Sequence, residues 1–264
     1  MLYPGSILAQ TPTAIIAFVL LIIIFLSYLA GAQLGNYQKK YNPEAKADGV
    51  GPLEGALLGL LALLLSFTFS MSASRFDKRN SLIVDEANNI STVVLRADMY
   101  PDSIRSLFKN DLREYIEARI AYYKAGNDKL LINKSLADAT RIFNTLWQRA
   151  NELSRNSTTT IPHSLMIPAL NDISDVVTSR DAARVARVPD PIIWLLIILS
   201  ILGSLIIGYS RKEKKSDWIV LSVYALMTVV TIYTIIDLDR PRQGMINTDT
   251  AHQKMIELRE LFAK

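Results

Sequence analysis

Four long apolar segments restrict this chain to folds that a lipid bilayer can accommodate. They cover residues 13–34, 53–71, 192–208 and 218–236. Three of them contain no Asp, Glu, Lys or Arg, and the second has only Glu54, next to its first residue. A helix rises about 1.5 Å per residue, so roughly 17 to 22 residues span 25–33 Å, which matches the hydrocarbon core of a bilayer. The sequence therefore predicts an integral membrane protein with four transmembrane helices.

The polar region between the second and third segments has the periodicity of helices. Apolar residues recur every three or four positions in three stripes. These stripes are Phe76, Ile83, Ala87, Ile90, Val94 and Ala97; Ile104, Phe108, Tyr115, Ile120 and Tyr123; and Leu136, Ala139, Phe143, Leu146, Ala150 and Leu153. Asp102, after Pro101, is expected near a helix N-cap, residues 126–128 form a turn, and a further helix covers residues 164–187. We therefore expect a helical bundle without strands.

The second segment is expected to continue out of the membrane as one helix. No glycine or proline occurs between Leu60 and Tyr100, so nothing breaks a helix of about 60 Å from Leu53 to beyond Ala87. The predicted fold is all-α, with four transmembrane helices and a membrane-proximal helical bundle continuous with the second helix. The predicted boundaries are 13–71 for the first two transmembrane helices, 72–188 for the extramembrane domain, 189–237 for the last two, and 238–264 for a tail with a short amphipathic helix.

The basic residues suggest an orientation in the cell (inner) membrane. Seven lie in the two short loops between transmembrane segments: Lys39, Lys40, Lys46, Arg211, Lys212, Lys214 and Lys215. Lys and Arg in short loops favour the cytoplasmic side, which would place the helical domain outside. Six basic residues at the membrane edge of the domain act against this orientation: Arg75, Lys78, Arg79, Arg180, Arg184 and Arg187.

The sequence contains no pattern typical of catalysis, metal binding or cofactor binding. It has no cysteine, and its two histidines, His163 and His252, lie in unrelated segments and form no paired-ligand pattern. Gly49, Gly51 and Gly55 precede a membrane helix and lack the following Gly-Lys-Ser/Thr of a phosphate loop. The basic residues are not interleaved with aromatic residues as a nucleic-acid surface requires. We therefore predict no enzyme, no cofactor and no nucleic-acid partner.

A stripe of small residues follows one face of the second segment, and a bulky stripe lies beside it. The small residues are Gly51, Gly55, Gly59, Ala62, Ser66, Ser70 and Ser74; the bulky ones are Leu60, Leu63, Leu64 and Phe67. The small stripe either packs closely against another helix or lines a narrow aqueous path. The bulky stripe would form a constriction that excludes water if it faced the axis of an oligomer. The candidate pore-lining residues are Leu63, Phe67, Ser66, Ser70 and Ser74.

Charged residues cluster where the second and fourth segments leave the membrane on the same side. This membrane-edge motif comprises Arg75, Arg79, Glu86, Asn88, Asp237, Asp239 and Arg240. Charges that are partly buried need partners, so Asp237 or Asp239 is expected to pair with Arg75 or Arg79. An ion-attracting vestibule is the alternative.

These residues also carry a family resemblance. The stretch 53–88, the pattern Arg-Phe-x-x-Arg-x(6)-Glu-Ala-Asn within it and the ending Asp-Leu-Asp-Arg-Pro-x-x-Gly resemble the bestrophin-like family of bacterial membrane proteins. The chain is more distantly similar to true bestrophins, through Leu57-Leu58-Gly59, Phe67, Ser74-Arg75-Phe76 and Arg79. It departs from them in having Asp77 and Lys78 in place of an aromatic pair, and in lacking an acidic cluster that resembles their calcium clasp.

The resemblance implies a pentameric channel, mostly for anions, whose apolar neck is lined by the second helix near Leu63 and Phe67. It also implies that the helical domain and both termini lie in the cytosol, opposite to the orientation that the short loops favour. The leading functional hypothesis is an oligomeric ion channel for small inorganic anions such as chloride. The alternative is a non-conducting membrane scaffold or sensor whose helical domain binds a partner protein.

Overall fold

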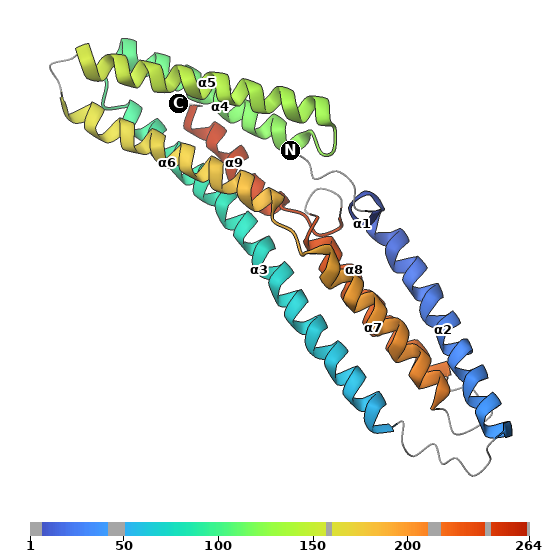
Figure 1. Ribbon diagram of the computed structural model, residues 1–264. Helices are drawn as coiled ribbons and strands as arrows, with labels where there is room; N and C mark the ends of the chain where they lie inside the picture. The colour runs from blue at the N-terminus through green and yellow to red at the C-terminus, as the bar shows by residue number, and fades with distance from the viewer. Residues whose placement is uncertain (1–6, 42–50, 157–159, 211–217, 241–243, 263–264) are drawn as a thin grey trace. The chain divides into compact units, whose positions relative to one another are not determined.

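The computed structural model describes residues 7–41, 51–156, 160–210, 218–240 and 244–262 (Figure 1). Within these ranges every regular element is a helix, so the all-α prediction is confirmed. The chain divides into two compact units. The transmembrane unit comprises residues 1–74, 187–240 and 244–246, and the helical unit comprises 75–186, 241–243 and 247–264. The loops expected at 42–50 and 211–217 lie outside the described residues.

The transmembrane unit is built from the four apolar segments. It contains α1 (Ile7–Gln10), α2 (Thr13–Tyr41), the first part of α3 (Gly51–Ala97), α7 (Asp190–Tyr209) and α8 (Trp218–Leu238). Four helices in the described chain are long and apolar enough to cross a membrane, which confirms the prediction of four spans. Their buried side chains form one core to which all four contribute.

Helices α2 and α7 pack closely because glycine lies where they meet. A Cβ added at Gly31 would overlap the carbonyl group of Leu205, whose carbon would be 2.9 Å away. A Cβ at Gly35 would lie 2.6 Å from the carbonyl oxygen of Tyr209. Two serine hydroxyls bond across the same contact: Ser27 Oγ donates to the Ile201 carbonyl oxygen at 2.8 Å, and Ser204 Oγ to that of Ile24 at 2.6 Å. Close backbone approach and hydroxyl hydrogen bonds are typical of helix packing in lipid.

Helix α3 is unbroken for 47 residues, from Gly51 to Ala97. This confirms the prediction of one helix from the second apolar segment to beyond Ala87. At about 1.5 Å per residue it is roughly 70 Å long. Its residues up to Ser74 belong to the transmembrane unit and those from Arg75 onward to the helical unit.

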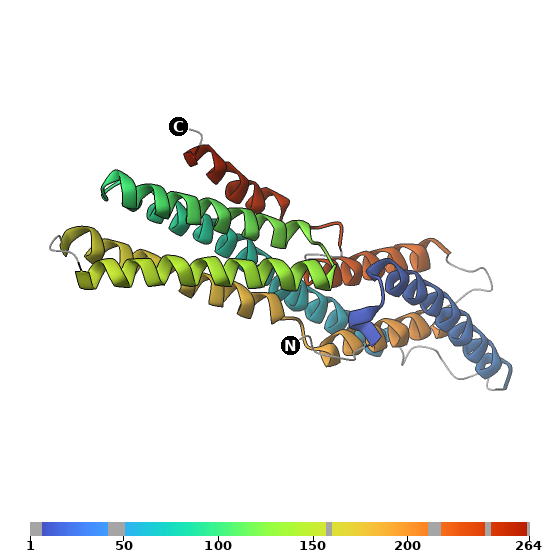
Figure 2. The ribbon, with the colours of Figure 1, turned by 90° about the horizontal axis from the view of Figure 1, so that it is seen from above.

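The helical unit combines the second part of α3 with α4 (Asp102–Lys124), α5 (Lys129–Asn156), α6 (Thr160–Val185), α9 (Asp249–Glu257) and the 3-10 helix η2 (Leu258–Phe262) (Figures 1 and 2). The hairpin of α4 and α5 turns through Gly126, whose φ of 52° favours glycine. Pro101 occupies the N-cap of α4 and Asp102 is its first helical residue, within the predicted N-cap region. The last helices complete the core, because Met255 and Leu258 pack with the buried side chains of α3 to α6.

Candidate functional site

The candidate pore-lining residues share the exposed side of α3. The side chains of Leu63 and Phe67 are 52% and 63% exposed, and Ser66, Ser70 and Ser74 are also exposed. The spanning window of α3 is 17% buried, whereas those of the other three spans are 28–39% buried. Within the protomer, this face of α3 is therefore not covered by another described helix.

The opposite side of α3 holds the helix against the rest of the transmembrane unit. Leu61, Thr68 and Ser72 are buried there. The side chains of Leu57 and Leu58 approach Gly203 of α7, where an added Cβ would lie 3.3 Å from each of them. One side of α3 is thus packed and the other is free.

Among the residues that the structure describes, none packs against the glycines of α3. A Cβ added at Gly51, Gly55 or Gly59 would meet nothing within 4 Å, whereas one at Gly31 would overlap backbone atoms of α7. Of the two interpretations of the small-residue stripe, close packing of these glycines is therefore not provided by any helix in the described part of the chain.

The end of α8 places a buried carboxylate against a glycine. Asp237 is fully buried, and its Oδ2 accepts a hydrogen bond from the backbone N–H of Ile246 at 2.9 Å. A Cβ added at Gly244 would lie 2.5 Å from the Cγ of Asp237. This approach explains why the Asp-Leu-Asp-Arg-Pro-x-x-Gly motif ends in glycine, since any other residue would force the carboxylate to move.

The two other charged residues of this motif bind backbone at the starts of other helices. Asp239 Oδ2 accepts a hydrogen bond from the backbone N–H of Val188, just before α7, at 2.9 Å. The guanidinium of Arg240 donates to the carbonyl oxygen of Thr11, just before α2, at 2.6 Å, and to that of Leu8. Through these hydrogen bonds the motif links the end of α8 to the backbone just before α7 and α2.

In the helical unit, Glu86 forms a buried ion pair with two arginines. Arg119 donates from Nε to Glu86 Oε1 at 2.5 Å and from Nη2 to Oε2 at 2.9 Å, and Arg180 donates from Nη1 to Oε2. Burial opposes ionisation of Glu86, but the two guanidinium groups outweigh it and hold the pKa of this carboxyl below its usual value. The side chain is inaccessible to solvent and lies in the part of α3 beyond the apolar segment.

The remaining members of the membrane-edge motif have separate positions. Arg79 donates to two carbonyl oxygens at the end of α6, that of Ala183 at 3.1 Å and that of Ala186 at 2.7 Å, where a cation also complements the helix dipole. Arg75 is half-buried and Asn88 is exposed. The predicted pairing of Asp237 or Asp239 with Arg75 or Arg79 stays a prediction.

Sequence reasoning did not find the arginine partners of Glu86, although two signals pointed to them. Glu86 lies next to Ala87 and one turn from Ile83 and Ile90, on the buried side of α3. Arg119 lies in the apolar stripe of α4, beside Ile120. A carboxylate and a guanidinium on two buried helix faces are expected to form an ion pair, because an unpaired buried charge is strongly unfavourable.

Comparisons with known proteins agree with this architecture. The Bestrophin-like domain profile matches residues 16–252, so the chain belongs to the bestrophin-like family. Crystal structures of a bacterial bestrophin homologue from Klebsiella pneumoniae have the same fold at 15% identity. One of its variants gives a TM-score of 0.69 and covers 94% of this chain and 99% of its own. Another variant gives a TM-score of 0.68 and covers 98% of this chain and 100% of its own. The structure phased with zinc gives 0.63, covering 90% of this chain and 98% of that one. No curated protein matches the chain.

Proposed function

We propose that the chain forms a homo-oligomeric ion channel in which copies of α3 surround the pore. The observation that carries the proposal is the free side of α3, where Leu63 and Phe67 lie beside Ser66, Ser70 and Ser74, all exposed in the protomer. Membership in the bestrophin-like family supports an ion channel, and the family resemblance suggests five copies.

The chemistry of this side of α3 fits an oligomer better than a lipid contact. Serine hydroxyls that face hydrocarbon have no partner outside their own helix, whereas they find one in water or on a neighbouring helix. The adjacent Leu63 and Phe67 would narrow the axis and resist wetting, which is a recognised form of gate. Ions would cross this apolar neck after losing part of their hydration.

Anions are the proposed cargo. Hydroxyl groups such as that of Ser70 donate hydrogen bonds to an anion, and the chain carries a net charge of +4. No acidic residue occurs on α3 between Gly55 and Arg75, so no carboxylate ring of the type that selects cations lines this stretch.

A flux assay with reconstituted protein tests the proposal. We expect Phe67→Ala to increase chloride flux several-fold because it widens the apolar neck, and Ser70→Leu to reduce it. Phe18→Ala is the matched control, since Phe18 on α2 is 64% exposed, against 63% for Phe67, and should leave flux unchanged. Chloride efflux from liposomes is measured for each protein, with oligomeric state checked by size-exclusion chromatography with light scattering.

The same experiment identifies the alternative function. If wild type and Phe67→Ala are both silent while the protein is folded and oligomeric, the channel proposal fails. The chain would then be a non-conducting scaffold or sensor, and a partner protein would be sought by pull-down with the full chain.

Membrane orientation is predicted by the short-loop charges and can be tested by labelling. Because the chain has no cysteine, single cysteines at Lys40 and Asn127 report on one short loop and on the helical unit. The seven basic residues in the short loops predict that an impermeant thiol reagent added outside intact cells labels position 127 and not position 40. Labelling of position 40 alone would assign the orientation implied by bestrophins, with the helical unit in the cytosol.

A further inference from the structure

The start of α5, just after the turn from α4, presents two leucines to solvent. Leu130 is 81% exposed, more than any other large apolar side chain in the described part of the helical unit, and Leu131 is 51% exposed. Lys129 and Lys134 are exposed as well. Because successive helical residues are about 100° apart, Lys134 lies between the two leucines on the helix face. We name these four residues the tip patch.

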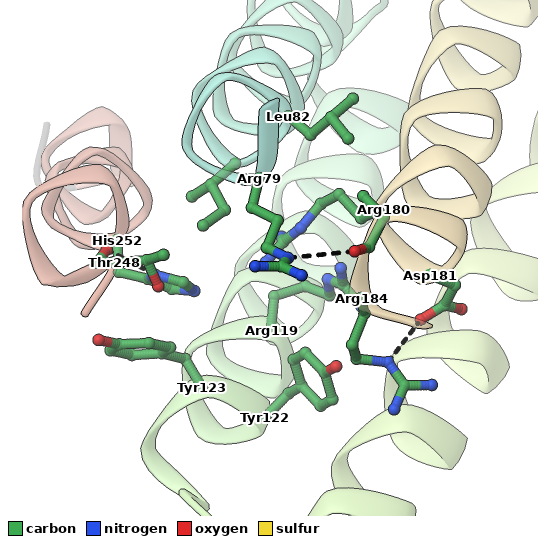
Figure 3. Close-up of a pocket in the computed structure, with 12 residues that line it drawn as sticks. Arg79, Leu82, Arg119, Tyr122, Tyr123, Arg180, Asp181, Arg184, Thr248 and His252 are labelled. Carbon is green, nitrogen blue, oxygen red and sulfur yellow. Dashed lines mark hydrogen bonds and ion pairs between the residues drawn. The ribbon is translucent and has the colours of Figure 1, made fainter. Parts of the chain in front are cut away.

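The tip patch is supported on both sides of the turn. Oδ1 of Asp128 accepts hydrogen bonds from the backbone N–H groups of Leu130 at 2.9 Å and of Leu131 at 3.2 Å, so it caps the start of α5. On the α4 side, the ring of Tyr123 stacks on His252 of α9 with centroids 3.3 Å apart (Figure 3). The leucines therefore face solvent from a fixed helix end, and little conformational entropy is lost when they bind a surface.

The charge within the tip patch is positive. No Asp or Glu occurs from Lys129 to Ala137. Acidic residues near the turn already have partners: Asp128 with the start of α5, Asp138 with Arg141, Asp249 with Tyr123, and Glu117 with Arg259. Lys124, at the end of α4, interacts with Glu117 and is not counted in the tip patch. Two amines and two leucines thus share one helix face without an acidic residue among them.

This composition fits a lipid surface better than another protein. Protein interfaces are enriched in aromatic residues and arginine and depleted in lysine. A tip patch from a second copy would bring lysines of its own, and like charges repel each other. Segments that lie on membranes instead combine aliphatic side chains, which enter the headgroup boundary, with lysines, which attract anionic lipids.

We propose that the tip patch docks onto the anionic headgroups of the bilayer that holds the transmembrane unit. The helical unit is tethered to that bilayer, because α3 passes into it after Ser74 and the chain returns to the transmembrane unit at Arg187. A tethered contact is intramolecular, so a weak affinity is sufficient. The two leucines enter the headgroup boundary and the two amines bind lipid phosphate oxygens. This contact does not depend on whether the chain conducts.

A fluorescent reporter in the full-length chain tests the contact. The native chain has no cysteine, so Asn133→Cys places a single label beside the tip patch. Ser154→Cys places one on the same helix about 30 Å away, and both positions are exposed. The protein is reconstituted in nanodiscs of phosphatidylcholine, with or without phosphatidylglycerol, that contain a lipid with a nitroxide quencher on its headgroup.

Position 133 should be quenched more strongly when phosphatidylglycerol is present. Added salt should reduce this difference, because it screens the lysines from the headgroups. Position 154 should be quenched equally in the two lipid mixtures. Lys129→Gln combined with Lys134→Gln should lower the ratio of docked to undocked tips by about tenfold or more.

The leucines are tested with a matched control pair. Leu130→Ser combined with Leu131→Ser should also reduce quenching at position 133 to the level seen in phosphatidylcholine alone, because the apolar contact is lost. Leu95→Ser combined with Leu107→Ser is the control. These two leucines are 61% and 46% exposed on the same unit, and their replacement should leave quenching unchanged.

The proposal is overturned if position 133 is quenched equally in the two lipid mixtures, since anionic headgroups would then play no part. It is also overturned if the control pair of leucines reduces quenching as much as the tip pair. If the tip variants change the oligomeric state and not the lipid dependence, the tip patch is a contact between copies rather than with lipid. Loss of folding cannot imitate the expected result, because the lipid dependence at position 133 is measured with the tip patch unaltered.

Discussion

Replacing Glu86 with glutamine is expected to destabilise the helical unit by about 3–5 kcal/mol. The amide keeps the shape of the side chain but leaves Arg119 and Arg180 without their anion, and Arg119 is almost fully buried. Breaking one side of a buried ion pair leaves an uncompensated charge away from water, which is the costly part of the change. Unfolding of the purified protein by denaturant, followed by circular dichroism, measures the loss.

The chain offers a matched control for this substitution. Glu117 also accepts two hydrogen bonds from one arginine, Arg259, at 2.7 and 2.6 Å. Both side chains of this pair are nearly half exposed, so Glu117→Gln should cost at most about 1 kcal/mol. Equal losses for the two variants would show that burial does not govern the strength of the Glu86 pair.

The pH dependence of the same pair has a defined sign. Arg119 and Arg180 outweigh the burial of Glu86 and lower its folded-state pKa below the ordinary value of 4.5. The ion pair therefore contributes fully above the unfolded-state pKa, and the contribution is lost as the pH falls through the folded-state pKa. The stability difference between wild type and Glu86→Gln should be constant from neutral pH down to about 5 and shrink below that. A difference that grows on acidification would contradict this assignment.

Replacing Gly31 with alanine is expected to destabilise the transmembrane unit by about 1–3 kcal/mol or more, because the new methyl group meets backbone rather than a movable side chain. Its Cβ would overlap the carbonyl group of Leu205 on α7. The two helices would have to separate, which would also lengthen the hydrogen bonds of Ser27 and Ser204 across the contact. Denaturant unfolding in detergent micelles measures the effect.

Gly55→Ala is the matched control and should act in the opposite direction. It places the same methyl group on a transmembrane helix where nothing lies within 4 Å. Alanine is favoured over glycine in a helix by about 1 kcal/mol, so the protomer should be unchanged or slightly more stable. If Gly31→Ala were as stable as wild type, the close packing of α2 and α7 would not matter energetically. If Gly55→Ala folded but no longer assembled, the small-residue stripe would be a contact between copies.

Much of the fold could be predicted because its causes are local. The four spans follow from runs without charge, and the unbroken α3 follows from the absence of glycine and proline between Leu60 and Tyr100. Helix α6 begins at Thr160, earlier than the predicted residue 164, because proline at position 162 is tolerated in a first helical turn. The contact of Gly31 with α7 could not be predicted, since it depends on which helix lies opposite.

The candidate site was predicted only in part, for the same reason. The exposed side of α3 carries the residues expected to line a pore, but exposure depends on which side packs against α7, and periodicity alone does not reveal this. The partners of Glu86 lie 33 and 94 residues away along the chain. The role of Asp239 depends on the backbone of Val188, and backbone partners leave no mark in the sequence.

The position of α9 in the chain has a consequence for biosynthesis. The helical unit is discontinuous: residues 75–186 are made before α7 and α8, and residues 247–264 after them. Met255 and Leu258 belong to its core, so that core closes only after residues 247–264 have left the ribosome. Domains otherwise fold as units while the chain emerges. Here the completion of the helical unit must wait until both later spans, α7 and α8, have been synthesised.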